Sequence, residues 1–279
     1  MSYKIVVDSC CELPKEYLND SRFERVPLGL EVGEDYRILD DESFNQAEFL
    51  RKVAECPTCP KSSCPSPERF MEAYDVDADH IYVVTLTSKL SGSYNSAVLA
   101  KNLFLESHEE KKIHVVDSLS ASGGETQIAL KCMELEEEGL PFEEIVERIE
   151  KFRDEMGTYF VLDNLETLRK NGRLSGVKAV VASTLNIKPV MKADEGEIVQ
   201  KGQSIGIKKA LTKMVDLLMS ELKDSEMKRV IITHCNAISK AEFVQKLLEA
   251  KIKCKEMLIL DMAGISSMYA NDGGIIVTI

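Results

Sequence analysis

Three serines lie within six residues of one another in the stretch from Val83 to Ala100. Ser88, Ser91 and Ser93 follow an apolar run typical of a β-strand, and a helix-like pattern begins directly after them. Hydroxyl groups and free backbone N–H groups at a helix start favour an anion, because the helix dipole is positive there. The stretch offers no base and no metal ligand, so it predicts a site that holds a carboxylate or phosphate rather than one that cuts a bond.

Apolar runs alternate with helical patterns through the first half of the chain. The strand-like runs are at 3–9, 80–86 and 112–118, and the helical patterns are at 44–55, 93–106 and 124–139. This alternation predicts a parallel sheet covered by helices on both faces. Ligands bind beyond the carboxyl ends of the strands in such sheets. We therefore expect Asp8, Ser9, Asp117 and Ser118, which end two of the runs, to lie near the three serines.

The pattern changes near residue 158, where the regular alternation stops. Residues 187–202 predict a hairpin that turns near Asp194–Gly196. The other expected elements are a helix at 176–186 capped by Ser175, helices at 207–223 and 241–250, and strands at 158–164, 229–235, 255–262 and 273–279. The prediction is an α/β protein of two domains: a three-layer α/β/α domain with a parallel sheet in residues 1–158, and an α/β domain with a mixed sheet in residues 159–279.

The composition excludes several classes of protein. The 279 residues carry a formal net charge of −12, which disfavours a general nucleic-acid role because phosphate binding needs a basic face. No apolar run approaches the ~18–20 residues of a membrane helix, and the N-terminal MSYKIVVDS lacks the pattern of a signal peptide. We therefore expect a cytoplasmic protein without stable membrane insertion.

Eight cysteines occur in the chain, and Cys56, Cys59 and Cys64 lie close together. In a cytosolic protein these thiols are expected to be reduced. Zinc would need a fourth ligand, and no histidine lies nearby in the sequence. We expect no metal or other cofactor, and we interpret the three thiols as incidental or redox-sensitive.

Six motifs in order resemble the DegV family, the bacterial proteins that bind fatty acids. They are DSCCELP (8–14), PKSSCPSP (60–67), TSKLSGSYNSA (87–97), VVDSLSASGGE (115–125), LRKNGRLSGVKA (168–179) and IKPV (187–190). Each motif alone is weak, but the likeness runs nearly from end to end. The resemblance implies a two-domain DegV-like fold. Some members serve as the fatty-acid-binding subunit of a bacterial fatty acid kinase. This subunit presents the bound acid to a separate ATP-using subunit.

The resemblance also implies which side chains hold the fatty-acid carboxylate. The family's loop threonine falls on Ser62, and its helix-start serine falls on Ser91. The family's C-terminal histidine motif is replaced by MYANDGGI (268–275), which places Tyr269 on the histidine with Asn271 close by. These four residues are the expected carboxylate-binding groups.

The arginine of the family's glycine-arginine turn falls on Arg173, and Arg169 lies near it. With Lys170 they make a small basic spot in an acidic protein. The resemblance implies contact with a phosphate or with the kinase subunit. The alternative is a solvated helix end, where cations are favoured by the helix dipole.

A bound acyl chain would need a buried apolar tunnel between the domains. Burying ~15 methylenes at ~0.8 kcal/mol each gives a gross ~12 kcal/mol before the costs of association. The expected walls are Phe160, Leu162, Val180, Val181, Leu185, Ile187 and Met191. The expected function is a non-catalytic carrier of a long-chain fatty acid, with the carboxylate held by hydroxyl groups.

Other interpretations of the same residues remain open. Serine also favours loops and helix caps, so Ser62 and Ser91 could have only these roles. A serine-dependent lipid or ester hydrolase is the alternative function, with His234 as base and Asp8 or Asp117 to orient it, although the chain lacks a GxSxG elbow. Neither a P-loop nor a GxGxxG motif is present, which argues against a nucleotide-binding module.

Overall fold

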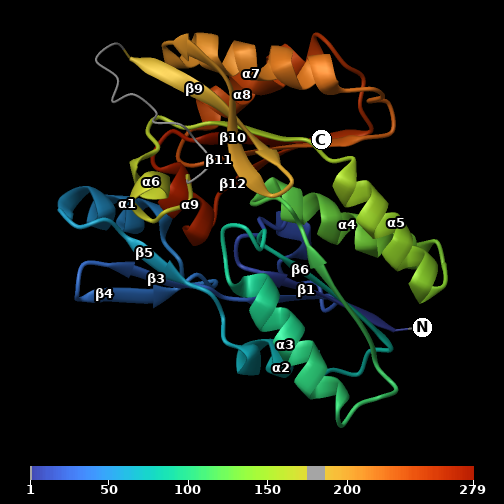
Figure 1. Cartoon of the computed structure of the whole chain (residues 1–279). Helices are drawn as coiled ribbons and strands as arrows, with labels where there is room; N and C mark the ends of the chain where they lie inside the picture. The colour runs from blue at the N-terminus through green and yellow to red at the C-terminus, as the bar shows by residue number, and fades with distance from the viewer. Residues whose placement is uncertain (1, 175–185) are drawn as a thin grey trace.

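The first large sheet, sheet A, is parallel throughout, as predicted. The computed structural model describes residues 2–174 and 186–279 (Figure 1), and the helix expected at 176–186 with its Ser175 cap lies outside those residues apart from its last position. Sheet A has the order β2-β1-β6-β7. Its strands are β1 (Tyr3–Asp8), β2 (Phe23–Val26), β6 (His80–Thr85) and β7 (Lys112–Asp117). The sequence analysis did not anticipate β2.

Helices cover both faces of sheet A and complete the predicted three layers. Alternate strand residues supply the two faces: Val6 packs with the helices on one side, and Ile5 and Val7 pack with those on the other. The helices of the first side are α2 (Pro67–Tyr74) and α3 (Ser93–Leu105), those of the second are α4 (Gly123–Glu137) and α5 (Phe142–Asp154), and a 3₁₀ turn, η1 (Lys15–Tyr17), follows β1.

The second large sheet, sheet C, is mixed and has the order β10-β9-β8-β13-β11-β12. Only β11 and β12 pair in parallel among these neighbours. Its strands are β8 (Thr158–Val161), β9 (Ile187–Asp194), β10 (Glu197–Ile205), β11 (Arg229–His234), β12 (Glu256–Asp261) and β13 (Ile275–Thr278), and its outer face carries α7 (Ile207–Glu221) and α8 (Ile238–Glu249). The predicted hairpin is confirmed, with Glu195 and Gly196 at positive φ in its turn.

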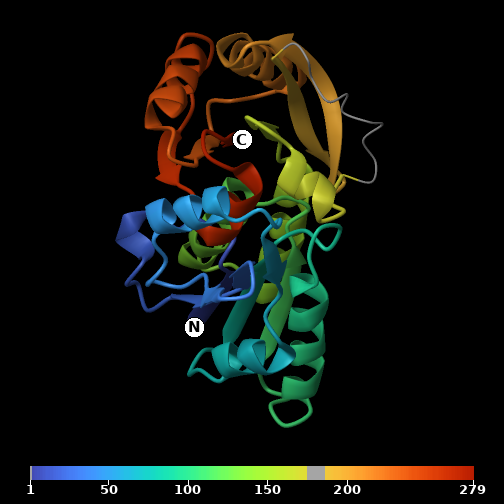
Figure 2. The ribbon, with the colours of Figure 1, turned by 90° about the vertical axis from the view of Figure 1, so that its left-hand side faces the viewer.

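A third sheet, sheet B, was missed by the sequence analysis. It is antiparallel, in the order β4-β3-β5, and its strands are β3 (Gly29–Val32), β4 (Tyr36–Leu39) and β5 (Lys61–Ser63). The nearby helices are α1 (Gln46–Glu55), α6 (Glu166–Lys170) and α9 (Gly264–Ala270). Helix α9 packs against α1 although more than 200 residues separate them in the chain (Figure 2).

Helix α4 joins the two large sheets, because it contacts β1 and β6 of sheet A as well as β11 and β13 of sheet C (Figure 1). The Gln127 side chain donates to the Arg229 carbonyl over 2.7 Å, and the Ser122 and Thr233 hydroxyls lie 2.8 Å apart. The domain division at residue 158 stays a prediction, and sheet C begins at Thr158. No helix in the described ranges is long and apolar enough to cross a membrane.

Four carboxylic acids are buried near the carboxyl end of β1: Asp8, Glu12, Asp40 and Glu125. Burial raises the pKa of the Glu12 carboxyl to about 7. Burial and the nearby Asp8 charge raise the pKa of Glu125 well above its usual range, and neither oxygen of Glu125 meets a hydrogen-bond partner within the described part of the chain. Glu12 and Glu125 therefore favour the protonated form, and ionising them opposes folding.

We predict that Glu12→Gln makes stability less dependent on pH. An unfolded glutamate ionises near pH 4.5, whereas folded Glu12 keeps its proton up to about pH 7. The free energy of unfolding therefore falls as pH rises through this window, by about 3 kcal/mol from Glu12. Urea unfolding between pH 5 and pH 8 should show that the free energy of unfolding of the variant rises relative to that of the wild type as pH increases. The surface substitution Glu16→Gln is the control, and equal pH slopes in all three proteins would contradict this assignment.

Candidate functional site

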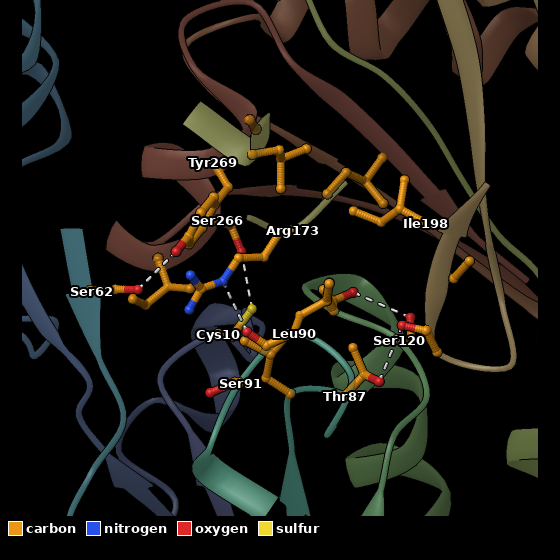
Figure 3. Close-up of a pocket in the computed structure, with 18 of the residues that line it drawn as sticks. Cys10, Ser62, Thr87, Leu90, Ser91, Ser120, Arg173, Ile198, Ser266 and Tyr269 are labelled. Atoms are coloured by element: carbon orange, nitrogen blue, oxygen red, sulfur yellow. Dashed lines mark hydrogen bonds between the residues drawn. The ribbon is translucent and has the colours of Figure 1, made fainter. Parts of the chain in front are cut away.

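A pocket of about 340 Å³ lies beyond the carboxyl ends of β1, β6 and β7, between sheet A and the inner face of sheet C (Figure 3). Its volume is within the ~300–1,000 Å³ usual for small-molecule sites. The position is the one that the sequence predicted for a parallel sheet. Its apolar walls come from both halves of the chain and include Leu28, Leu86, Leu90, Phe160, Leu162, Leu168, Ile198, Ile265 and Ile276.

Hydroxyl groups from separate elements meet at one end of the pocket. Ser62 of β5 and Tyr269 of α9 are joined by a hydrogen bond of 3.0 Å between their hydroxyl oxygens (Figure 3). Ser91, in the loop before α3, also lines the pocket. Arg173, which follows α6, brings a guanidinium to this end, and its Nε donates to the Leu90 carbonyl over 3.2 Å. We call Ser62, Ser91, Arg173 and Tyr269 the polar end of the pocket.

Ser91 has a local structural contact as well as a place in the pocket wall. Its hydroxyl oxygen accepts the backbone N–H of Ser93 over 3.2 Å and lies 3.1 Å from the Ser93 hydroxyl. Gly92, between them, approaches Cys64 so closely that a Cβ there would lie 2.9 Å from the sulfur. Ser91 thus lines the pocket while its hydroxyl is oriented by the first turn of α3.

The hairpin turn of sheet C closes the pocket at another side. The Gly196 carbonyl accepts the Thr87 hydroxyl over 3.3 Å, and a Cβ on Gly196 would lie only 2.4 Å from that hydroxyl oxygen. Gly196 also has φ +82°. Both the backbone conformation and the close approach therefore require glycine at this turn.

Two predicted polar residues do not line the pocket. Arg169 lies on the exposed side of α6, where its Nη2 pairs with Glu166 over 2.7 Å. Asn271 follows α9; its Nδ2 donates to the Tyr269 carbonyl over 3.1 Å and its Oδ1 accepts the Thr167 hydroxyl over 3.1 Å. Asn271 thus contacts the backbone that carries Tyr269 rather than the pocket.

The predicted walls are only partly those of the pocket. Phe160 and Leu162 line it, whereas Ile187 and Met191 do not, and Val180, Val181 and Leu185 lie outside the described residues. Met191 is fully buried beside Phe160, its cross-strand partner, in the same apolar cluster. Leu28, Leu86, Ile198, Ile265 and Ile276 were missed, because an apolar residue that lines a pocket has the same sequence signature as a residue of the core.

The residues considered for a hydrolase are separated from the pocket's serines. His234 Nδ1 lies 3.5 Å from Asp261 and accepts the Ala237 N–H, and burial lowers the pKa of this imidazole. Asp8 accepts the backbone N–H groups of Cys10 and Leu86, and Asp117 accepts those of Ser88 and Leu119. None of these three side chains lines the pocket. The two aspartates organise the strand-end loops instead.

All eight cysteines are free. Cys59 accepts the Asn171 amide over 3.5 Å, Cys56 lies 3.1 Å from the Thr58 hydroxyl, and exposed Cys64 lines the pocket. Within residues 2–174 and 186–279, the structure has no group of three or more His, Cys, Asp or Glu side chains arranged to hold a metal ion.

The chain matches a known family in sequence and in fold. The family model described as "Uncharacterised protein, DegV family" matches residues 2–278. A DegV domain-containing protein of Streptococcus pneumoniae is 36% identical over 282 residues, covering 99% of this chain and 98% of its own. The chain belongs to the DegV family, as its motifs predicted.

Several similar solved structures contain fatty acids. A DegV family protein of Ruminococcus gnavus with vaccenic acid has a TM-score of 0.97 and 52% identity, with all of both chains covered. The Fatty Acid Kinase (Fak) B3 protein of Streptococcus pneumoniae, loaded with linoleic acid, has a TM-score of 0.90 and 33% identity, covering 100% of this chain and 99% of its own. A Eubacterium eligens DegV family protein loaded with heptadecanoic acid has a TM-score of 0.90 and 29% identity, covering 99% of each chain.

We predict that Gly196→Ala destabilises the protein more than Gly139→Ala. Both glycines have positive φ, which costs an alanine about 1–2 kcal/mol. A Cβ at Gly139 meets nothing within 4 Å, whereas one at Gly196 overlaps Thr87 and adds about 1–3 kcal/mol. Equilibrium unfolding of both variants measures the difference. Equal losses would mean that the hairpin turn does not press on the Thr87 loop.

Proposed function

We propose that this protein binds one long-chain fatty acid, with its tail in the apolar pocket and its carboxylate at the polar end. The observation that carries the proposal is the pocket itself, whose apolar walls from both large sheets lead to hydroxyl groups and one guanidinium. The fatty acids seen in the family members from Ruminococcus gnavus, Eubacterium eligens and Streptococcus pneumoniae support this assignment.

The hydroxyls of Ser62, Ser91 and Tyr269 are the proposed donors to the carboxylate. Hydrogen bonds to a charged group contribute about 1.5–3 kcal/mol each, and each buried methylene of the tail contributes ~0.8 kcal/mol. The tail therefore supplies most of the affinity, and the polar end fixes which way round the acid lies. Asn271 acts on this site through the backbone of Tyr269, which its side-chain amide holds.

The protein serves as a carrier that presents the acid to a separate kinase subunit. Its likeness to the Fak B3 protein supports this assignment. Arg173 at the polar end suits a phosphoryl group on the carboxylate, since guanidinium donors match phosphate oxygens. Arg169 points outward beside Glu166 and is the candidate contact with the partner subunit.

Lipid extraction and titration test this function. Mass spectrometry of lipid released from denatured protein should identify a fatty acid, at up to one per chain. Affinity measured by titration should rise several-fold with each added methylene until the pocket is full, because tail burial dominates. The protein alone should not hydrolyse esters. Equal affinity for short and long acids would refute tail burial, and ester turnover that depends on Ser91 would establish the hydrolase instead.

We predict that Ser91→Ala weakens fatty-acid binding by about 1–3 kcal/mol, because the buried carboxylate loses a donor. Stability should fall by no more than the ~1 kcal/mol of a lost helix cap. Ser88→Ala, in the same loop but outside the pocket wall, is the matched control and should bind like the wild type. Wild-type affinity in the Ser91 variant would leave Ser91 with a capping role alone.

A further inference from the structure

Helix α9 carries four residues of the pocket wall, Ile265, Ser266, Tyr269 and Ala270, yet it is only seven residues long. Isolated helices of this length are not stable in water. The position of Tyr269 must therefore be set by what holds α9 from outside. The contacts that do so come from a distant part of the chain, next to sheet B.

Asp40, the residue after β4, holds the first turn of α9. Its two carboxylate oxygens accept the backbone N–H groups of Gly264 and Ile265 over 2.8 and 2.9 Å. The Asp40 side chain is fully buried, and its own N–H donates to the Leu28 carbonyl over 2.9 Å. A Cβ on Gly264 would lie 2.7 Å from the Asp40 carboxylate and 2.5 Å from Leu30. The backbone of α9 therefore lies directly against sheet B.

The same sheet also places the partner of Tyr269. In sheet B, β3 pairs with β4 on one side and with β5 on the other, and Leu30 lies opposite Ser62. Ser62 then meets Tyr269 over 3.0 Å. The contacts form a closed ring: Asp40 leads through β4, β3 and β5 to Ser62, and Ser62 leads through Tyr269 and α9 back to Asp40.

A second contact from the same segment holds α9 farther along the helix. Gln46, at the start of α1, donates through its amide nitrogen to the Met262 carbonyl over 2.8 Å and to the Ser267 hydroxyl over 3.0 Å. Residues 40–46 thus hold α9 at its first turn and at its middle. A shift of this segment would move Tyr269 relative to Ser62.

We propose that Asp40 is a positioning residue for the polar end of the pocket, acting on the bound carboxylate through α9 and Tyr269. This inference rests on the proposed function. Asparagine at position 40 has the shape of aspartate but keeps a single acceptor oxygen, so its amide group would face one of the two helix N–H groups. Helix α9 would then be released at its first turn, and the Tyr269 hydroxyl would lose its fixed place beside Ser62.

A double-mutant cycle tests this role. Asp40→Asn should weaken binding of a long-chain fatty acid by about tenfold, a coupling typical of residues in one network. In a Tyr269→Phe background, which already lacks the hydroxyl, the same substitution should change affinity by less than about twofold. Binding of the fatty alcohol of equal length should change much less than that of the acid, because the tail contacts remain.

Two further variants control the experiment. Asp41→Asn makes the same chemical change at the neighbouring residue, whose carboxylate accepts from Ser43 instead of from α9, and it should bind like the wild type. Gly264→Ala disturbs the contact from the α9 side and should show the same coupling to Tyr269→Phe, which keeps the test valid if Asp40→Asn folds poorly. Thermal unfolding of each variant establishes that the folded protein is being measured.

The outcomes separate the two proposals. Equal losses from Asp40→Asn with and without the Tyr269 hydroxyl, equal losses for acid and alcohol, or no loss at all would each overturn the positioning role while leaving fatty-acid binding intact. A wild-type protein that binds no fatty acid would overturn the proposed function, and this inference with it. The positioning role is supported if Asp40→Asn weakens binding of the acid but not of the alcohol, and if this loss of affinity disappears in the Tyr269→Phe background.

Discussion

The width of the pocket depends on helix α4, which packs against both large sheets. Its start is so close to sheet C that a Cβ on Gly123 would lie 2.9 Å from Ile231 and 3.1 Å from the Thr278 hydroxyl. Farther along, Gln127 reaches the Arg229 and Thr278 carbonyls. These contacts fix the spacing of the sheets beside the pocket. Because protein interiors are close-packed and have few voids, a bulkier residue at Gly123 would push the sheets apart.

The pocket has apolar walls and a polar end, and the two are built from different parts of the chain. Its apolar walls belong largely to the sheets and to the loops at their edges. The polar end is assembled from four separate segments: β5, the loop before α3, the residues after α6, and α9. Apolar contact is tolerant of small shifts, whereas a hydrogen bond weakens steeply with distance and angle. The geometry of the polar end therefore depends on the contacts that hold these four segments against one another.

The sequence was informative where periodicity was strong. The β-branched runs of β1, β6 and β7 and the hairpin at Glu195–Gly196 were predicted correctly, and so was the pocket at the strand ends. Sheet B was missed because its strands have only three or four residues, such as Lys61–Ser63. Helix α9 was missed because GISSMYA has little intrinsic helix preference and is held in place by Asp40 and Gln46.

Four of the six predicted polar residues line the pocket, since family motifs mark positions that local patterns cannot. The pocket walls could not be predicted in the same way. Met191 and Ile276 are the two cross-strand neighbours of Phe160, yet Ile276 lines the pocket and Met191 does not. Which of them meets a ligand is decided by the packing of the whole sheet rather than by neighbours in the sequence.

The place of β13 in sheet C has a consequence for how the molecule folds. This strand is the last along the chain, but it lies between β8 and β11 near the middle of the sheet. Until β13 is inserted, sheet C is divided into two parts, one with the hairpin and one with β11 and β12. The contact between Ser62 and Tyr269 likewise joins residues 207 positions apart. Long-range contacts of this kind form late, because the loop must close before the contact stabilises it. A nascent chain therefore contains Ser62 and Ser91 long before its pocket is complete, and only the fully folded molecule has the whole site.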